Sequence, residues 1–550
     1  MKLNKFLMLF MVLAFTVILA ACNFGGEEEP AEVETTDDGQ TEAPVETEKV
    51  MNLLIPSEPP SLHPQLATDT TSGTILQNTF EGLVTLVDGE PELTGATDYK
   101  VSDDLLTYTF TLRDAKWSNG DAVTADDYAY AWQFALNPEN ASEYASILYA
   151  IKGAQAYNLG EGSAEDVGIK VIDPKTIEIT LEAPTPYFLE LLAFKTYYPI
   201  HKATAEANPE WYTEAEGYVS NGAFTLAAWQ HSGSLTLKKN EQYWDAAVVN
   251  LSTVNIEIVE SEVTQVTKFD NGEIDFLGPS FGVVSLDAID RLKADGKLQI
   301  ADYTGVYMYK FNTTDEIMSN ANIRKALTLA IDRTSLIENI TKGEQVPALG
   351  LVPNSVEGFG DDAGYYKDND IEGAKAALAE GLKELGLSDP SELNITLSFN
   401  TSEAHSAIAQ FIQEGWSKNL GINVKLDNAE WQVYLDKLSN LDYQIGRLGW
   451  IADYNDAYTF LEQYDSATNG NNDTGWENPE YTQLLTQSKT ETDPAKRIEL
   501  LLQAEEIFMA ELPVAPIYYY TNLYVKQDYV QNMAPDVLGN INLKYVDITK

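Results

Sequence analysis

The side chains best suited to catalysis or metal binding are few in this chain and are scattered along it. There are four histidines in 550 residues, at positions 63, 201, 231 and 405, and one cysteine, Cys22. A zinc site or a nucleophilic enzyme needs several such residues at a characteristic spacing. No phosphate-binding glycine loop, serine elbow or His-Glu-x-x-His sequence is present. The sequence therefore predicts no catalytic residue, no metal and no cofactor, and it favours a binding protein over an enzyme.

Cys22 lies where a covalent modification is expected. Lys2 and Lys5 precede an apolar run, residues 6–21, which ends in Leu19-Ala-Ala-Cys22. A basic start, an apolar stretch shorter than the roughly 20 residues of a membrane-spanning helix, and small residues before a cut are typical of an export signal. The ending resembles a bacterial lipobox. This implies a signal peptide at residues 1–21 and two acyl chains on Cys22 that hold the protein on a membrane. A cleaved secretory signal with an incidental cysteine is the alternative.

Residues 22–49 are predicted to be a flexible acidic tether. Residues 23–48 contain ten acidic side chains and no basic one, and segments of this composition do not fold. The whole chain has 35 basic and 85 acidic residues, a net charge of −50. Residues 49–550 retain 75 acids and 33 bases, so they carry −42 by themselves. Nucleic-acid binding requires the opposite sign and is excluded, whereas a ligand with a positive group is favoured.

Strand and helix patterns alternate through the rest of the chain. Polar and apolar residues alternate in 107–112, 176–181, 235–237 and 254–258, which predicts half-buried strands. A helix is predicted over residues 324–340. Another carries the stripe Ile408, Phe411, Ile412, Trp416 and Leu420, and a third begins at Asp493-Pro494, an N-cap followed by a first-turn proline. Interleaved strands and helices indicate an α/β protein.

Several runs, in order along the chain, carry a resemblance to a known family. They are Ser57–Pro64, Phe80–Leu83, Tyr108–Gly120, Val123–Tyr128, Ser220–Phe224, Lys239–Asp245, Gly272–Asp275, Arg324–Leu327, Ala330–Arg333 and Gly449–Asp456. Together they resemble the solute-binding lipoproteins of ABC-type oligopeptide importers, bacterial extracellular solute-binding protein family 5. The family more usually has Asp where this chain has His63.

The resemblance implies an α/β, two-lobed periplasmic-binding-protein type II fold with an extra domain inserted in lobe I. Lobe I would consist of residues 50–80, 204–304 and 520–550, and the additional domain of residues 81–203. Lobe II would be residues 305–519. The ligand would lie between the lobes, and closure of the lobes would bury it.

The resemblance also implies which residues line the cleft. Asp453 matches the family acid that binds the amino terminus of a peptide, although it could instead cap a turn. Arg447 matches an arginine near the carboxyl end of the ligand, and Tyr144 a tyrosine that contacts the ligand. Thr68, Asp69 and Thr70 match a segment that pairs with the peptide like an added strand. The remaining matches, each of which could also be a packing residue, are Asn400, His405, Trp431, Trp450, Tyr518, Tyr519 and Tyr520.

Two departures concern the carboxyl end of the ligand. Some relatives hold the carboxylate of a short peptide with basic residues of the second lobe. This chain has Leu438 at one such position, beside Lys437, and Asp315 at another. The prediction is that it does not clamp tri- or tetrapeptides by their terminal charge, but takes longer peptides or uses Arg447 alone.

The predicted function follows from the resemblance. The protein would be an extracytoplasmic lipoprotein, monomeric and anchored on a Gram-positive cell membrane. It would capture oligopeptides and deliver them to the permease of an ABC importer with separate ATPase subunits. Alternatives are a dipeptide-, signalling-peptide-, nickel-chelate- or sugar-oligomer-binding protein of the same fold. From other classes, a surface peptidase and a structural or chaperone-like lipoprotein remain open.

Overall fold

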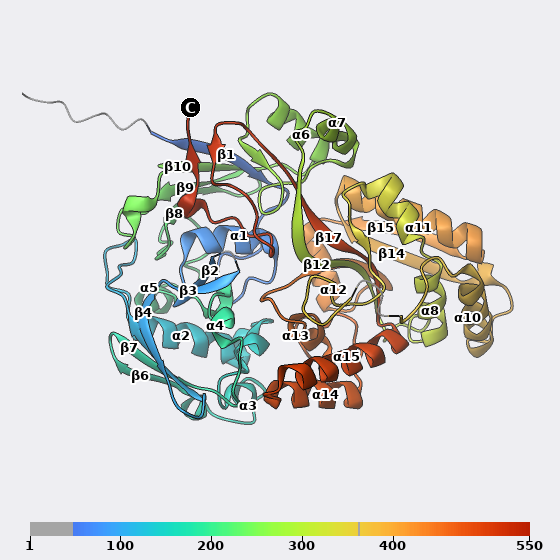
Figure 1. The fold of residues 1–550 in the computed structure, drawn as a ribbon, viewed down its shortest axis with the longest axis horizontal. Coiled ribbons are helices and arrows are strands. Elements are labelled where there is room, and N and C mark those ends of the chain that lie inside the picture. Colours follow the sequence, from blue (N-terminus) through green and yellow to red (C-terminus); the bar gives the residue numbers. More distant parts are fainter. Residues whose placement is uncertain (1–47, 88, 361–363) are drawn as a thin grey trace, which may run out of the picture. The chain divides into compact units, whose positions relative to one another are not determined.

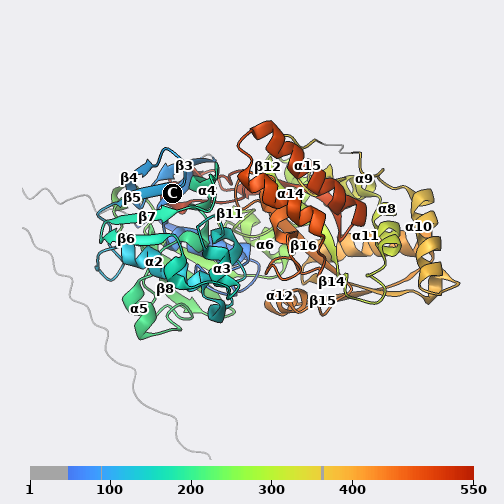
Figure 2. The ribbon, with the colours of Figure 1, turned by 90° about the horizontal axis from the view of Figure 1, so that it is seen from below.

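The computed structural model describes residues 48–87, 89–360 and 364–550, and residues Glu48–Lys550 form one compact unit. The predicted signal peptide, Cys22 and nearly all of the predicted tether lie outside the described residues. Figures 1 and 2 show the unit from two directions.

In the described part of the chain, the strands form three larger sheets and two sheets of only two strands each. One four-stranded sheet has the order β1 (Val50–Ile55), β10 (Thr253–Ile258), β9 (Ser234–Lys239), β8 (Phe224–Gln230). A second has the order β4 (Ala96–Val101), β5 (Thr107–Leu112), β7 (Thr176–Thr180), β6 (Ile169–Asp173). The seven-stranded sheet has the order β11 (Phe276–Leu277), β17 (Val514–Lys526), β12 (Gln299–Phe311), β16 (Ile445–Ile451), β14 (Asn394–Asn400), β15 (Asn423–Ala429), with β13 (Val346–Pro347) also on β17. The pairs are β2 (Val84–Val87) with β3 (Glu90–Leu93), and β18 (Val530–Gln531) with β19 (Asp547–Ile548).

The α-helices cover these sheets. They are α1 (Thr70–Thr79), α2 (Ala125–Leu136), α3 (Ala154–Asn158), α4 (Phe188–Leu191), α5 (Lys202–Ala207), α6 (Glu262–Asp270), α7 (Ile289–Ala294), α8 (Ala321–Leu329), α9 (Arg333–Leu336), α10 (Ile371–Glu384), α11 (Glu403–Leu420), α12 (Trp431–Ser439), α13 (Tyr458–Leu461), α14 (Pro479–Thr490) and α15 (Pro494–Glu511). In Figure 1 the long strands β12 and β17 run between the four-stranded β8–β10 sheet and the helices α8, α10 and α11.

The seven-stranded sheet is buried on both faces. Successive side chains of a strand point to opposite faces, and on β12 Val306 and Met308 join one hydrophobic cluster while Tyr307 and Tyr309 join another. The first cluster includes residues of α13 and α15, and the second includes residues of α8, α10 and α11. The central strands of this sheet are therefore held by close packing, which also supports any residue that they present to a cavity.

The sequence-predicted strands are confirmed as β5, β7, β9 and β10, and two of the predicted helices as α11 and α15. Asp493 accepts hydrogen bonds from the backbone N–H groups of Ala495 and Lys496. Pro494 occupies the first turn of α15, where its missing N–H donor has no partner to lose.

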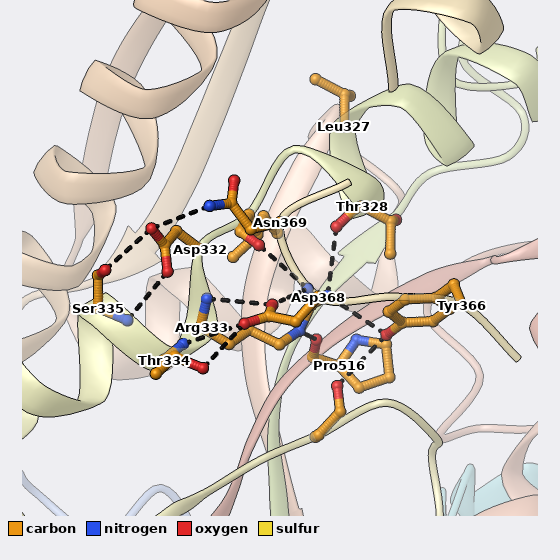
Figure 3. Close-up of polar contacts among 12 residues, drawn as sticks. Leu327, Thr328, Asp332, Arg333, Thr334, Ser335, Tyr366, Asp368, Asn369 and Pro516 are labelled. Atoms are coloured by element: carbon orange, nitrogen blue, oxygen red, sulfur yellow. Dashed lines mark hydrogen bonds and ion pairs between the residues drawn. The ribbon is translucent and has the colours of Figure 1, made fainter. Parts of the chain in front are cut away.

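The single helix predicted over residues 324–340 is wrong. The chain forms α8, breaks, and restarts as α9 and a π-helical turn, Ile337–Thr341. Asp332 starts the second helix by accepting a hydrogen bond from Ser335 N at 3.0 Å. The fully buried Arg333 guanidinium donates to Pro516 O at 2.8 Å and pairs with Asp368 at 3.2 Å, which ties this break to strand β17 (Figure 3).

Candidate binding cavity

A cavity of about 890 Å³ lies against the central strands β12, β16 and β17 of the seven-stranded sheet. Its opposite wall comes from the start of α1 and from residues around 144 and 195. The lining includes most residues that the sequence analysis assigned to a ligand cleft. They are Thr68, Asp69, Thr70, Tyr144, His405, Trp431, Arg447, Trp450, Asp453, Tyr518 and Tyr520.

Two of the predicted residues do not line the cavity. Tyr519 lies between Tyr518 and Tyr520 on β17, so strand alternation turns its side chain to the other face. There it is buried and its hydroxyl donates to Gly350 O at 3.2 Å. Asn400 is the last residue of β14, and its Oδ1 accepts a hydrogen bond from Arg447 Nη1 at 3.3 Å. Neither Tyr519 nor Asn400 is therefore part of the cavity lining, and contact of either residue with a ligand stays a prediction.

Asp453 follows the end of β16 by two residues. Its backbone N–H donates to the hydroxyl oxygen of Thr459 at 3.2 Å, and the Thr459 hydroxyl lies 3.5 Å from Asp453 Oδ2. Burial raises the pKa of Asp453 to about 7, while Lys195 and the Thr459 hydrogen bond oppose that rise. No Lys, Arg or His among the described residues lies within 4.0 Å of its carboxylate. The cavity thus contains an acid without a contacting cation, which an incoming ammonium group could satisfy.

Arg447 lies in the middle of β16. Its Nη2 donates to the Tyr520 hydroxyl at 2.9 Å, and its guanidinium stacks over the Tyr307 ring at 4.6 Å from the centroid. Its Nε is buried and has no hydrogen-bond acceptor in the described part of the chain, where no carboxylate lies within 4.0 Å of the guanidinium either. A buried guanidinium held by neutral groups is suited to receive an anion such as a carboxylate.

His405 adds no charge beside Arg447. It lies in the first turn of α11, and its Nδ1 is 3.3 Å from the Tyr307 hydroxyl. Burial, and secondarily the Arg447 charge, lower the pKa of His405 well below its ordinary value. The imidazole is therefore neutral near pH 7, and Arg447 provides the positive charge of this end of the cavity.

Aromatic side chains form the wall near Asp453. Tyr144 stacks on Trp450 with ring centroids 6.3 Å apart, and Trp450 Nε1 donates to the Thr459 hydroxyl at 3.4 Å. On the other side, Trp431 Nε1 donates to Asp69 Oδ2 at 3.2 Å. Asp69 is the N-cap of α1, and Thr70 is the first residue of that helix. Pairing of residues 68–70 with a ligand backbone stays a prediction.

The residues at the positions that depart from the family pattern all contact other residues of this protein. Lys437 pairs with Asp427 at 2.9 Å and does not line the cavity. Leu438 lines the cavity with an apolar side chain, and it packs beside Tyr434 and Tyr443 in a small hydrophobic cluster. Asp315 accepts hydrogen bonds from the backbone N–H groups of Ile317 and Met318. None of these positions places a second cation next to Arg447.

Sequence reasoning missed Lys195. It begins the 3-10 helix η4 (Lys195–Tyr197) and lines the cavity, with its Nζ 4.0 Å from the Phe194 ring centroid and 4.7 Å from that of Tyr144. No motif surrounds it, and it lies far from Asp453 in the sequence. Only the folded chain brings these two residues to one cavity.

The N-termini of helices α6 and α11 cap each other, although the two helices belong to different hydrophobic clusters. Helix α6 packs in a cluster with Val266, Phe269 and Ile289, whereas α11 packs in the cluster of Tyr307 and Trp416. Glu262 accepts from the Ser402 hydroxyl at 2.6 Å and from Ala404 N at 3.2 Å. Reciprocally, Glu403 accepts from the Ser261 hydroxyl at 3.1 Å and from Val263 N at 3.2 Å. A backbone N–H group in the first turn of each helix has no acceptor within its own helix, and it donates instead to a glutamate carboxylate of the other helix.

Within residues 48–87, 89–360 and 364–550, no helix is long and apolar enough to cross a membrane. The same residues contain no group of three or more His, Cys, Asp or Glu side chains placed to hold a metal ion.

Comparison with known proteins identifies the class. Residues 63–472 match the bacterial extracellular solute-binding proteins, family 5. The chain is 50% identical over 536 residues to the oligopeptide-binding protein OppA of Bacillus subtilis, covering 96% of this chain and 97% of that one. It is 37% identical over 508 residues to the dipeptide-binding protein DppE of the same organism, covering 91% and 92% of the two chains. The chain therefore belongs to family 5 of the extracellular solute-binding proteins.

Solved structures agree with this assignment and with the type II fold. Listeria monocytogenes OppA bound to peptide superposes with a TM-score of 0.84 at 32% identity, covering 92% of this chain and 99% of that one. The murein tripeptide binding protein MppA of Escherichia coli superposes with a TM-score of 0.85, but its unliganded open form with only 0.60, both at 30% identity and 92% coverage of this chain. They cover 99% and 98% of the MppA chains. The present structure thus differs from the open form of MppA.

Proposed function

We propose that this protein captures oligopeptides in the cavity between its lobes, with the amino terminus at Asp453 and the carboxyl terminus directed toward Arg447. The observation that carries the proposal is that one cavity contains both a carboxylate without a contacting cation and a guanidinium without a contacting anion. A zwitterion of matching length supplies both missing charges, and it would replace water that each group loses on closure.

The spacing of the two charges limits the ligand. Arg447 and Asp453 are six positions apart, and β16 covers most of that distance, so their Cα atoms are at most about 20 Å apart at roughly 3.3 Å per residue. An extended peptide spans about 3.3–3.6 Å per residue. A peptide of up to about six residues could therefore satisfy both groups with its two ends. Longer peptides would have to pass Arg447 with their carboxylate unused.

The relatives support this choice of ligand and a role in import. OppA of Bacillus subtilis is named an oligopeptide-binding protein, and OppA of Listeria monocytogenes is described as bound to peptide. We infer delivery of the bound peptide to the permease of an ABC importer with separate ATPase subunits. We also infer anchoring as a monomer on the outer face of a Gram-positive cell membrane, through acyl chains on Cys22.

Lobe closure is the proposed capture step. Lobe I would be residues 50–80, 204–304 and 520–550 with residues 81–203 attached, and lobe II residues 305–519. With these boundaries, the Asp69–Trp431 hydrogen bond and the reciprocal caps of α6 and α11 join the two lobes. The much better superposition on one MppA form than on its unliganded open form agrees with a closed arrangement.

The direct test is isothermal titration calorimetry with penta-alanine, its N-acetylated form and its C-amidated form. We expect saturable one-to-one binding of the free peptide, a large loss on acetylation and a smaller loss on amidation. Equal affinity for the free and the acetylated peptides would overturn the proposal. Mass spectrometry of ligands that co-purify with the protein would give the natural peptide lengths.

The alternatives give different outcomes in the same experiments. A dipeptide-binding protein, as DppE is named, would bind dialanine more tightly than penta-alanine. Ligands without an amino terminus, such as nickel chelates or sugar oligomers, would not require Asp453. A peptidase would release cleavage products from penta-alanine, and a structural lipoprotein or chaperone would show no saturable binding.

A further inference from the structure

Among the described residues, Lys195 is the only positively charged group whose charge lowers the pKa of Asp453. Its side chain is half-buried against Phe194 and Tyr144, so the ammonium rests on two ring faces. Ring faces attract a cation through their quadrupole. The contact holds Lys195 at the cavity wall without neutralising its charge.

Other buried lysines of this protein have a carboxylate in contact. Lys310 pairs with Asp473 at 2.8 Å, and Lys544 pairs with Asp245 at 2.9 Å. Within the described ranges, Lys195 has no carboxylate within 4.0 Å. Burial lowers the pKa of Lys195, whereas the charges of Asp453 and Asp69 raise it. Its ammonium therefore acts on two carboxylates of the same cavity without contacting either one.

The other charged or titratable groups around Asp453 do not replace Lys195. From α13, Thr459 offers only a hydroxyl. From the next turn, η9 (Glu462–Tyr464), Glu462 is a second acid whose pKa burial raises to about 8, so it is mostly neutral near pH 7. Burial raises the pKa of Tyr144 well above its ordinary value, and Asp453 adds to this. Asp69, on the far side, is an acid capped on α1.

We propose that Lys195 is a specificity-determining residue of this cavity: its ammonium, which rests on the cavity wall without a carboxylate in contact, favours the ionised form of the Asp453 carboxylate and so prepares it for the amino group of a ligand. The inference rests on the proposed role of Asp453. Without Lys195, a larger fraction of this carboxyl group would be protonated near neutral pH and unavailable to an ammonium group. An opposite charge nearby favours the ionised form of an acid by about 1–3 pH units.

The arrangement also limits the charge of the ligand. Asp453 and Asp69 share this end of the cavity with one cation, Lys195, and Glu143, whose pKa burial raises to about 7, also lines the cavity. A second positive charge from a lysine or arginine side chain at the first ligand residue would be repelled by Lys195. Peptides with an uncharged first side chain are therefore the preferred class.

The test is the pH dependence of penta-alanine affinity in the intact protein, measured by calorimetry from pH 5.5 to 8.5. Affinity falls on the acid side as Asp453 binds a proton, and on the alkaline side as the peptide amino group, with a pKa of about 7.7–8.0, loses one. We expect Lys195→Met to move the acid side by about one pH unit upward, so that the affinity ratio between pH 7.5 and pH 6 grows severalfold. The alkaline side belongs to the ligand and should not move.

Two control variants separate charge from packing. Lys195→Arg keeps the charge and should retain the wild-type acid side within about half a pH unit. Lys202→Met removes a half-buried lysine that lies 5.9 Å from the Tyr130 ring centroid and outside the cavity, and it should change nothing. If the affinity falls over the same acidic pH range in Lys195→Met as in wild type, the inference is overturned.

Asp453→Asn distinguishes this failure from a failure of the proposed function. If Asp453 binds the amino group, Asp453→Asn abolishes the acid-side dependence and most of the affinity, whatever Lys195 does. If Asp453→Asn binds like wild type, the site assignment is wrong and the inference is wrong with it. A peptide beginning with lysine should gain affinity relative to penta-alanine in Lys195→Met, and no gain would contradict the charge limit.

Discussion

The two ends of the cavity hold their charges in different ways. The Asp453 carboxylate lies just after a strand end, contacts only a hydroxyl group, and has one nearby cation, Lys195, that does not touch it. Arg447 is fixed in mid-strand between Tyr520, Asn400 and the Tyr307 ring, beside a neutral histidine. The acidic end therefore titrates near neutral pH, whereas the basic end keeps its charge. We therefore expect the contribution of the acidic end to ligand affinity to depend on pH and on the ligand amino group. The contribution of the basic end should depend on ligand length.

The largest expected effect is at the acidic end. Asp453→Asn keeps the shape of the side chain and removes its charge, so the buried ammonium of the ligand loses its counter-ion. We expect penta-alanine binding to weaken by about 2–5 kcal/mol, measured by calorimetry at pH 7.5. N-acetylated penta-alanine, which lacks the ammonium, should bind wild type and variant alike; a clear difference between them would assign the loss to misfolding.

The second effect distinguishes the ends by ligand length. Arg447→Met removes the guanidinium but keeps an unbranched stem. We expect a loss of about 1.5–3 kcal/mol for free penta-alanine and little loss for its amide. For a peptide of nine or ten residues the variant and wild type should agree, because its carboxylate lies past Arg447. Loss that is independent of both length and amidation would show that Arg447 supports the fold and not the ligand carboxylate.

The third effect follows from the raised pKa of Asp453, about 7 in the empty protein. The ligand requires the ionised acid, so affinity is complete above this pKa and is lost as the pH falls through it. Each pH unit below about 7 should weaken penta-alanine binding by up to tenfold, or about 1.4 kcal/mol. N-acetylated penta-alanine should show no such dependence. Equal acid sensitivity of both peptides would place the titrating group elsewhere.

The smallest effect is at the basic end. Tyr520→Phe removes the hydroxyl that accepts from Arg447 Nη2 at 2.9 Å. The guanidinium keeps its charge and its place over Tyr307, so penta-alanine affinity should fall by only about 0.5–1.5 kcal/mol. Tyr518→Phe is the matched control, since Tyr518 also lines the cavity and packs edge-to-face against Tyr520. A larger loss for Tyr518→Phe would mean that the Tyr518 hydroxyl contributes more to binding than the hydrogen bond between Arg447 and Tyr520.

Local elements could be predicted where local chemistry determines them. Alternation in residues 107–112 and the Asp493-Pro494 start of α15 both appear as predicted. The prediction of one helix over residues 324–340 was wrong because Asp332 caps a new helix, and because the buried contact of Arg333 with β17 stabilises the interruption. This contact involves a strand almost two hundred residues away, so no local sequence pattern could have indicated it.

The same division applies to the cavity. The ordered motifs of the sequence were sufficient to predict the fold class and to nominate Asp453, Arg447 and Tyr144, because covalent order and residue type identify a family. Which tyrosine of Tyr518-Tyr519-Tyr520 turns away from the cavity depended on the register of β17. The partnership of Lys195 with Asp453, the neutrality of His405 and the raised pKa of Asp453 depended on burial, and burial arises only when distant segments pack together and exclude water.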